Sequence, residues 1–202
     1  MNHFRTIKLN VESKYLERGS QFISYLVPFS SILDFKKNLK KLRFEHKSSS
    51  HICNAYRIFT DTILQEKGSD DGEPSGSAGV PMLNELKRWD LINVGVFVVR
   101  YFGGRKLGVS GLIHCYSESV RLCIDKAHTI QWNPTNSFLM SHDYSNLSKI
   151  DFLIRKYNGK LLSRDFNLYI DSKFQINEDI VDDFKKDAID QGLIDVPIKK
   201  IK

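Results

Sequence analysis

Three carboxylate side chains stand within four residues of one another, at Asp70, Asp71 and Glu73. Such a cluster could bind a divalent cation, or it could supply the acid and the base of a catalytic reaction. No second acidic cluster lies nearby in the sequence to complete a metal site, so we predict neither a metal ion nor another cofactor. We favour a structural role, in which these carboxylates accept hydrogen bonds from the amides of the surrounding glycine-rich loop or pair with an arginine.

Three further side chains near this cluster could take part in catalysis, namely His51, Ser75 and Ser77. The segment GEPSGSAG that holds the two serines is not the G-x-S-x-G elbow of a hydrolase, and it does not follow a predicted strand. We therefore expect His51, Ser75 and Ser77 to shape the loop rather than to react.

A second glycine-rich loop, GGRKLGVS, occupies residues 103–110 between an apolar run and a helical pattern. Gly103, Gly108 and Ser110 have the spacing of a phosphate-binding P-loop, but Val109 stands where that motif requires a lysine. A nucleotide triphosphatase is therefore rejected. Glycine-freed amides beside a helix N-terminus still favour an anion, although the glycines could instead serve only tight turns and close packing.

Basic side chains around this loop would add positive charge to an anion site. The residues predicted to contact phosphates or to stack on bases are Arg57, Arg100, Tyr101, Gly103, Gly104, Arg105, Lys106 and Ser110. The net charge of +6 lies entirely in residues 1–130, because acidic and basic residues balance in residues 131–202. A basic excess suits a polyanion such as RNA, although it is also compatible with mere solubility.

The composition is that of an ordinary globular protein, with 202 residues, of which 41% are hydrophobic and 27% are charged. No apolar run approaches the length that crosses a bilayer, and the first residues do not resemble an export signal. The three cysteines have no C-x-x-C spacing, which favours reduced thiols. We therefore expect a cytoplasmic protein without a membrane partner.

Apolar periodicity places these motifs on a mixed set of helices and strands. Strands are predicted at residues 6–13, 20–28, 51–59 and 93–101, a long loop at 60–79, and helices at 32–47, 79–86 and 111–127, the last capped by Ser110. Turn signals and the charge balance change at residues 133–136, which predicts a domain boundary there. The β-α-β-β-α order that follows, with a short final strand, predicts a compact α+β sandwich.

On these motifs the chain resembles the YigZ/IMPACT family. The resemblance is carried by SDDGEPSGSAGVPML at residues 69–83, by NVGVFVVRYFGGRKLGVSGL at residues 93–112, and by His51-x-Cys53-x-Ala55-Tyr56-Arg57 upstream. Together these segments cover most of residues 15–125. The usual family pattern has Thr where this chain has Ser77, Gly where it has Ser110, and Arg-Ala where it has His114-Cys115. This chain therefore keeps the hydroxyl at position 77 and lacks one positive charge at position 114.

The resemblance implies two α+β domains. Residues 1–132 should form a β-α-β domain of the type shared by a ribosomal protein and elongation factor G, and residues 133–202 a ferredoxin-like α/β sandwich similar to the last domain of elongation factor G. Eukaryotic relatives act in translational control, where they keep an initiation-factor kinase from its activator. They carry an extra N-terminal interaction domain that we do not expect here, so that kinase role is not carried over.

Bacterial relatives are suspected of binding nucleic acid, and some carry a proline-dipeptidase label. No two-metal ligand set for such a peptidase can be assembled from these residues. We therefore predict a non-enzymatic, translation-associated regulator that binds RNA or a ribosomal component, with a protein partner in translation as a further expectation. The alternatives are a hydrolase or transferase acting on a phosphorylated small molecule, with Asp71 or Glu73 as its base, and a purely protein-binding module.

Overall fold

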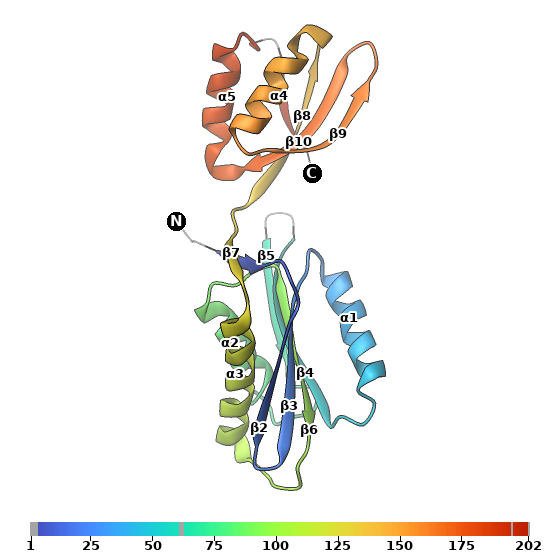
Figure 1. Ribbon diagram of the computed structural model, residues 1–202, viewed down its shortest axis with the longest axis vertical. Coiled ribbons are helices and arrows are strands. Elements are labelled where there is room, and N and C mark those ends of the chain that lie inside the picture. The colour runs from blue at the N-terminus through green and yellow to red at the C-terminus, as the bar shows by residue number, and fades with distance from the viewer. Residues whose placement is uncertain (1–3, 61–62, 195, 202) are drawn as a thin grey trace. The chain divides into compact units, whose positions relative to one another are not determined.

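The computed structural model describes residues 4–60, 63–194 and 196–201 of the chain. The chain divides into two compact units, Met1–Trp132 and Asn133–Lys202, which are shown in Figure 1. Each unit combines helices with an antiparallel sheet, so the α+β class is confirmed.

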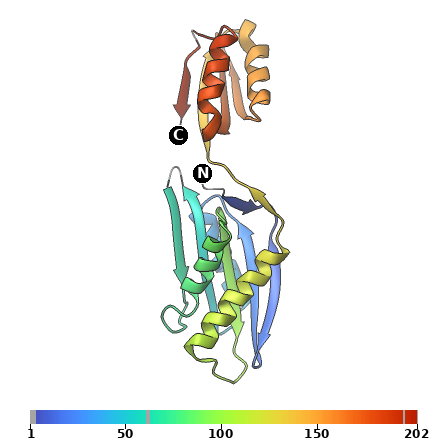
Figure 2. The ribbon, with the colours of Figure 1, turned by 90° about the vertical axis from the view of Figure 1, so that its left-hand side faces the viewer.

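The first unit is built on a five-stranded sheet in the order β2-β3-β6-β4-β5. Its strands are β2 (Val11–Glu17), β3 (Ser20–Pro28), β4 (His51–Thr60), β5 (Ile63–Ser69) and β6 (Val94–Tyr101). Helix α1 (Ile32–Glu45) covers one face, and helices α2 (Gly79–Arg88) and α3 (Gly108–Lys126) cover the other (Figures 1 and 2). Two short strands, β1 (Arg5–Ile7) and β7 (Thr129–Gln131), pair separately.

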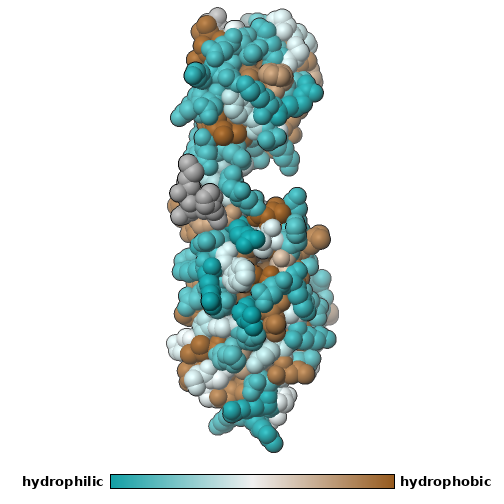
Figure 3. All heavy atoms as spheres, turned by 60° about the vertical axis from the view of Figure 1, so that its left-hand side comes forward, coloured by the Kyte–Doolittle hydropathy of each residue, from teal (hydrophilic) through white to brown (hydrophobic). Residues whose placement is uncertain are grey.

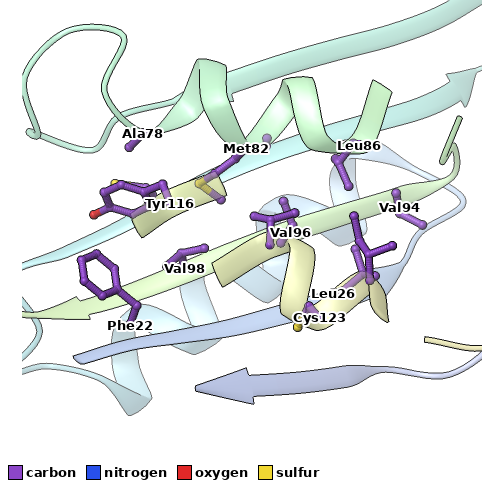
Figure 4. Packing of buried hydrophobic residues seen from close by; sticks show 14 of the residues in the cluster. Phe22, Leu26, Ala78, Met82, Leu86, Val94, Val96, Val98, Tyr116 and Cys123 are labelled. Atoms are coloured by element: carbon purple, nitrogen blue, oxygen red, sulfur yellow. The ribbon is translucent and has the colours of Figure 1, made fainter. Parts of the chain in front are cut away.

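Strand β6 lies at the centre of this sheet and is buried on both faces. Because side chains alternate along a strand, Val96 and Val98 point towards α2 and α3, whereas Phe97 and Val99 point towards α1. Figure 4 shows Met82 of α2 beside this apolar layer. This two-sided burial explains the near-continuous apolar run in the sequence.

Three expectations for this unit are wrong. Residues 6–13 do not form one strand, because they include parts of β1 and β2, which belong to different sheets. Residues 60–79 are not one long loop, because β5 occupies Ile63–Ser69 and pairs with β4. The segment was missed because Gln65, Glu66 and Lys67 give an edge strand with little apolar pattern, whose pairing depends on its neighbour. Ser110 does not cap α3 either, since the helix already begins at Gly108.

The second unit has the strand order β11-β8-β10-β9, and all of its strand pairs are antiparallel. Its elements in chain order are β8 (Thr135–His142), α4 (Leu147–Lys156), β9 (Lys160–Phe166), β10 (Ile170–Asn177), α5 (Val181–Asp190) and β11 (Ile198–Ile201). This β-α-β-β-α-β arrangement is the predicted ferredoxin-like sandwich. Its core, which includes Phe138, Phe174 and Phe184, is separate from the cores of the first unit.

The face shown in Figure 3 is mainly hydrophilic, and its hydrophobic residues are scattered over both units. In the residues that the structure describes, no helix is both long enough and apolar enough to cross a membrane.

The separate core of the second unit leads to a first prediction. A fragment of residues 133–202 should fold alone and unfold cooperatively on heating, because its apolar side chains pack on one another. Circular dichroism melts would measure this. As a control, Phe174→Ala removes a side chain that is 0% exposed and should cost about 3–5 kcal/mol, abolishing the transition. A fragment without any cooperative transition would contradict the prediction.

Candidate functional site

Both glycine-rich loops lie at the same end of the five-stranded sheet. The first residue of β4, His51, lies opposite Arg100 near the end of β6. The last residue of β5, Ser69, pairs with Asn54 of β4, three residues further along. The loop of residues 70–78 follows β5, and the loop of residues 102–107 follows β6. The register of three strands therefore brings the two motifs together, although they are about thirty residues apart in sequence.

A buried ion pair joins the first loop to the end of β6, directly before the second loop. Arg100 Nη1 donates to Glu73 Oε1 at 2.6 Å, and the Tyr116 hydroxyl of α3 donates to the same oxygen at 2.8 Å. Glu73 is 9% exposed and Arg100 is 5% exposed. Burial first, and then the neighbouring Cys53 and Glu73, raise the pKa of Tyr116 far above its ordinary value, so the phenol stays protonated and donates.

Asp70 closes the first loop on the N-terminus of α2. Its carboxylate accepts hydrogen bonds from the backbone N–H groups of Gly76, Ala78 and Gly79 at 2.9, 2.9 and 2.8 Å. Ala78, the N-cap residue of α2, has no side-chain cap of its own, so Asp70 takes that role from eight residues upstream. Partial burial alone would raise the pKa of Asp70, but the three N–H donors outweigh it and lower the pKa below its usual value.

Asp71 fixes the other side of the same loop. Its carboxylate accepts from the backbone N–H of Ile52 at 2.8 Å and from Arg43 Nη2 of α1 at 2.7 Å. The Asp71 carbonyl oxygen lies 2.8 Å from His51 Nδ1. Asp71 and the following Gly72 both have positive φ angles, 46° and 90°, which turn the chain sharply at this point. Neither Asp71 nor Glu73 is thus free to act as a catalytic base.

The serines and the cysteine of this region are also part of the loop structure. Ser77 is buried and donates to the Pro74 carbonyl at 2.6 Å, whereas Ser75 is exposed. Cys53 Sγ donates to the Asp70 carbonyl at 2.9 Å, and burial raises the pKa of this thiol strongly. Within the described part of the chain, no group of three or more His, Cys, Asp or Glu side chains is arranged to hold a metal ion.

Two arginines that were predicted to contact phosphates or bases have partners within the protein. Arg57 is 7% exposed, and it pairs with Glu66 at 3.0 Å and donates to the Leu91 carbonyl at 3.1 Å, near the C-terminal end of α2. Arg100 is held by Glu73, as described above. Both guanidinium groups are therefore unavailable to a nucleic acid.

Tyr101 points away from Arg100, because neighbouring residues of a strand face opposite sides of the sheet. Its ring packs against the α1 side of the sheet, where its hydroxyl lies 2.8 Å from His46 Nδ1. The Tyr25 hydroxyl lies 3.1 Å from Nε2 of the same histidine. Tyr101 therefore belongs to the α1 face of the sheet, opposite to the face on which Arg100 meets Glu73.

The amides that the sequence suggested for an anion are only partly free. The first loop gives its amides to Asp70, and Gly103 N donates to Ser20 Oγ at 3.1 Å. By contrast, Gly104, Arg105, Lys106 and Ser110 are exposed. Among the ion pairs of the described residues, none involves Arg105 or Lys106. The anion site predicted at the second loop is thus limited to the exposed residues of that loop and the start of α3.

Two residues at this end were missed by sequence reasoning. The tight β2–β3 turn packs against the second loop so closely that a Cβ added to Gly103 would lie 1.9 Å from the Gly19 carbonyl carbon. This contact brings Arg18, whose side chain is 62% exposed, beside the loop. Phe102, which is 50% exposed, begins the loop itself. An Arg-Gly turn in a hairpin is visible in the sequence, but its packing partner is not, because the β3–β6 pairing is long-range.

Comparison with known proteins agrees with these motifs. The model of the Impact N-terminal domain matches residues 18–124. The chain is 35% identical over 156 residues to the IMPACT family member YvyE of Bacillus subtilis, covering 77% of this chain and 71% of YvyE. It belongs to the IMPACT family. The family member YigZ of Escherichia coli is 31% identical over 154 residues, covering 76% of each chain. The resemblance stated from the sequence is therefore confirmed.

Solved structures extend the likeness of this IMPACT family member to both units. A crystal structure described as that of an hypothetical protein superposes with a TM-score of 0.73 and 26% identity, covering 100% of this chain and 98% of the other. Yih1, described as a two-domain translational regulator, is 26% identical over 58% of this chain and 47% of its own. The superposition with Yih1 has a TM-score of 0.42.

The capping role of Asp70 leads to a second prediction. Asp70→Asn should lower the free energy of unfolding at neutral pH by about 1–2 kcal/mol, because an amide cannot accept three N–H bonds as well as a carboxylate does. The pKa of Asp70 is lowered in the folded protein. The stabilisation is therefore present above the unfolded-state pKa of about 3.9, and it is lost as the pH falls through the lower folded-state value.

Urea unfolding of the wild type and of Asp70→Asn at several pH values would measure this effect. The difference in stability should be largest near neutral pH and should shrink below about pH 4. Asp90→Asn is a matched control, because Asp90 is exposed at a turn with a φ of 51°, which asparagine also tolerates. A difference between wild type and Asp70→Asn that did not change with pH would contradict the prediction.

The buried ion pair leads to a third prediction. Glu73→Gln should destabilise the protein by about 3–5 kcal/mol, because it leaves the Arg100 guanidinium buried without a counter-charge. Glu118→Gln removes a carboxylate that pairs with Arg121 on the surface of α3 and should cost less than about 1 kcal/mol. Chemical unfolding curves would compare the two variants. If the two variants lost the same free energy of unfolding, the buried pair would stabilise the protein no more than a surface pair does, which would contradict the prediction.

Proposed function

We propose that this member of the IMPACT family binds RNA, or an RNA surface of the ribosome, and acts in the regulation of translation. The observation that carries the proposal is the exposed basic loop after β6, which leads directly into the N-terminus of α3. The place in translation rests on the family, because Yih1 is described as a translational regulator and because the resemblance implies such a role for eukaryotic relatives.

The start of α3 supports an anion partner. This helix has 19 residues, its N-cap residue Leu107 makes no side-chain capping bond, and no acidic residue lies in its first turn. The first backbone N–H groups of a helix lack partners within the helix and carry a partial positive charge. Phosphate oxygens of a nucleic acid can take the place that a capping side chain leaves open.

The charges around the loop also favour a polyanion. Arg105 and Lys106 are exposed, and Arg18 makes only a loose contact of 3.6 Å with Glu17. Two of the three nearby carboxylates do not cancel this field, because an arginine already pairs with each of them, and the third is bonded by backbone amides at the N-terminus of α2. Asp70 is bonded by three amides, Asp71 by Arg43, and Glu73 by Arg100. In the proposed interface, the acidic cluster shapes the site and the second loop contacts RNA.

A fourth prediction tests this interface. The double variant Arg105→Ala/Lys106→Ala should weaken binding of a short RNA at low salt, because two phosphate contacts are lost. It should also reduce the dependence of log K on log salt by about 0.7 for each contact with a single strand. Fluorescence anisotropy titrations at a series of KCl concentrations would measure both effects.

The matched control is Lys185→Ala/Lys186→Ala on α5, which removes the same charge from the second unit and whose lysines are exposed. This control should leave the affinity and the salt dependence close to those of the wild type. If wild-type protein shows no affinity for RNA at low salt, the proposed function fails. If both double variants lose the same affinity, binding depends on net charge and not on the loop.

A further inference from the structure

Phe102 presents an aromatic ring to solvent at the start of the proposed RNA-binding loop. It is 50% exposed, although it directly follows the strand whose other aromatic and aliphatic residues form the core. A single exposed hydrophobic side chain is common on protein surfaces and means little alone. What distinguishes Phe102 is how firmly the structure holds it in this position.

The backbone at Phe102 is anchored from two sides. Its N–H donates to Ser50 Oγ at 3.2 Å, and the next N–H, that of Gly103, donates to Ser20 Oγ at 3.1 Å. Gly103 also lies directly against Gly19, with no room for a Cβ. Two consecutive amides are thus bonded to side chains from different segments of the first unit. The backbone that carries the Phe102 ring is therefore held more firmly than that of most loop residues.

A buried cation supports the ring. The guanidinium carbon of Arg100 lies 5.5 Å from the centroid of the Phe102 ring and 5.5 Å from that of Phe22, which is fully buried. Glu73 holds Arg100 in place through Nη1, and Arg100 Nε has no hydrogen-bond partner within the described structure. The guanidinium can therefore interact with the Phe102 ring by a cation–π contact. The buried ion pair therefore also positions the exposed ring.

A fixed, half-exposed ring beside free cations suits one class of ligand. Arg105 and Lys106 follow Phe102 within four residues and can contact phosphates, while the ring offers a flat face for an unpaired base. A duplex keeps its bases stacked inside and cannot offer such a face, whereas proteins that bind unpaired RNA commonly stack its bases on aromatic side chains. We propose that Phe102 is a base-stacking residue and that the site takes single-stranded RNA.

This inference rests on the proposed function, and one experiment tests both. Fluorescence anisotropy would compare a labelled single-stranded RNA with a blunt-ended RNA duplex that has no loop, using the full chain. Wild-type protein should prefer the single strand. Phe102→Ala should weaken single-strand binding by about 5- to 150-fold, the loss expected for one stacked base, while leaving duplex binding unchanged. Phe102→Tyr should retain the preference, and Phe102→Leu, which is apolar but lacks a ring, should not.

The salt dependence separates stacking from charge. Phe102→Ala should keep the slope of log K against log salt, because it removes no phosphate contact, whereas Arg105→Ala/Lys106→Ala should reduce it. Phe44→Ala is the matched control, since Phe44 is 71% exposed on α1 beside Lys47 and should not affect RNA binding. Thermal melts would check that each variant is folded.

The outcomes distinguish the two proposals. If the wild type binds no RNA at low salt, the proposed function and this inference both fail. If the wild type binds RNA but Phe102→Ala binds the single strand equally well, only the stacking inference is overturned. The same holds if Phe102→Ala loses single-strand and duplex binding to the same extent, or if Phe44→Ala has the same effect as Phe102→Ala.

Discussion

The buried pair of Glu73 and Arg100 is the interaction on which the loop end of the first unit depends. A carboxylate and a guanidinium are costly to remove from water, and only their short mutual contact, with the Tyr116 hydroxyl as an additional donor, compensates for that cost. The pair connects the first loop to the end of the central strand and, through Tyr116, to the third turn of α3. Loops that are separate in sequence are thereby held as one surface.

Charged residues at this end divide into two groups with different tasks. Those inside, such as Asp70, Arg57 and Arg100, are matched by amides, carbonyls or opposite charges and maintain the shape. Those outside, such as Arg105 and Lys106, lack partners in the described structure and are free to meet a ligand. A family motif that is rich in charge is therefore not in itself a binding site, because most of its charge is already satisfied by the protein.

Local signals in the sequence were enough to place the central strand, most helices and the β-α-β-β-α order of the second unit, whereas its ferredoxin-like fold was implied by the family resemblance. Long-range pairing was not visible. The strand β5 has a polar sequence and is a strand only because β4 offers an edge, and the partners of Arg57 and Arg100 depend on a register that one sequence does not show. The orientation of Tyr101 is different in kind. Side chains alternate along β6, so Tyr101 faces the side of the sheet opposite to Arg100. The exposed aromatic residue beside the second loop is instead Phe102, which lies just beyond the end of the strand and could have been predicted from the sequence.

The three thiols described in the first unit have a practical consequence. Cys53, Cys115 and Cys123 are buried and unpaired, and burial raises the pKa of each, in the case of Cys115 to about 11. Thiolates, not thiols, attack maleimides and disulfides, so all three native cysteines should be inert to such reagents at neutral pH. A cysteine introduced on the surface would then carry a fluorophore or spin label alone, without any need to remove the native ones.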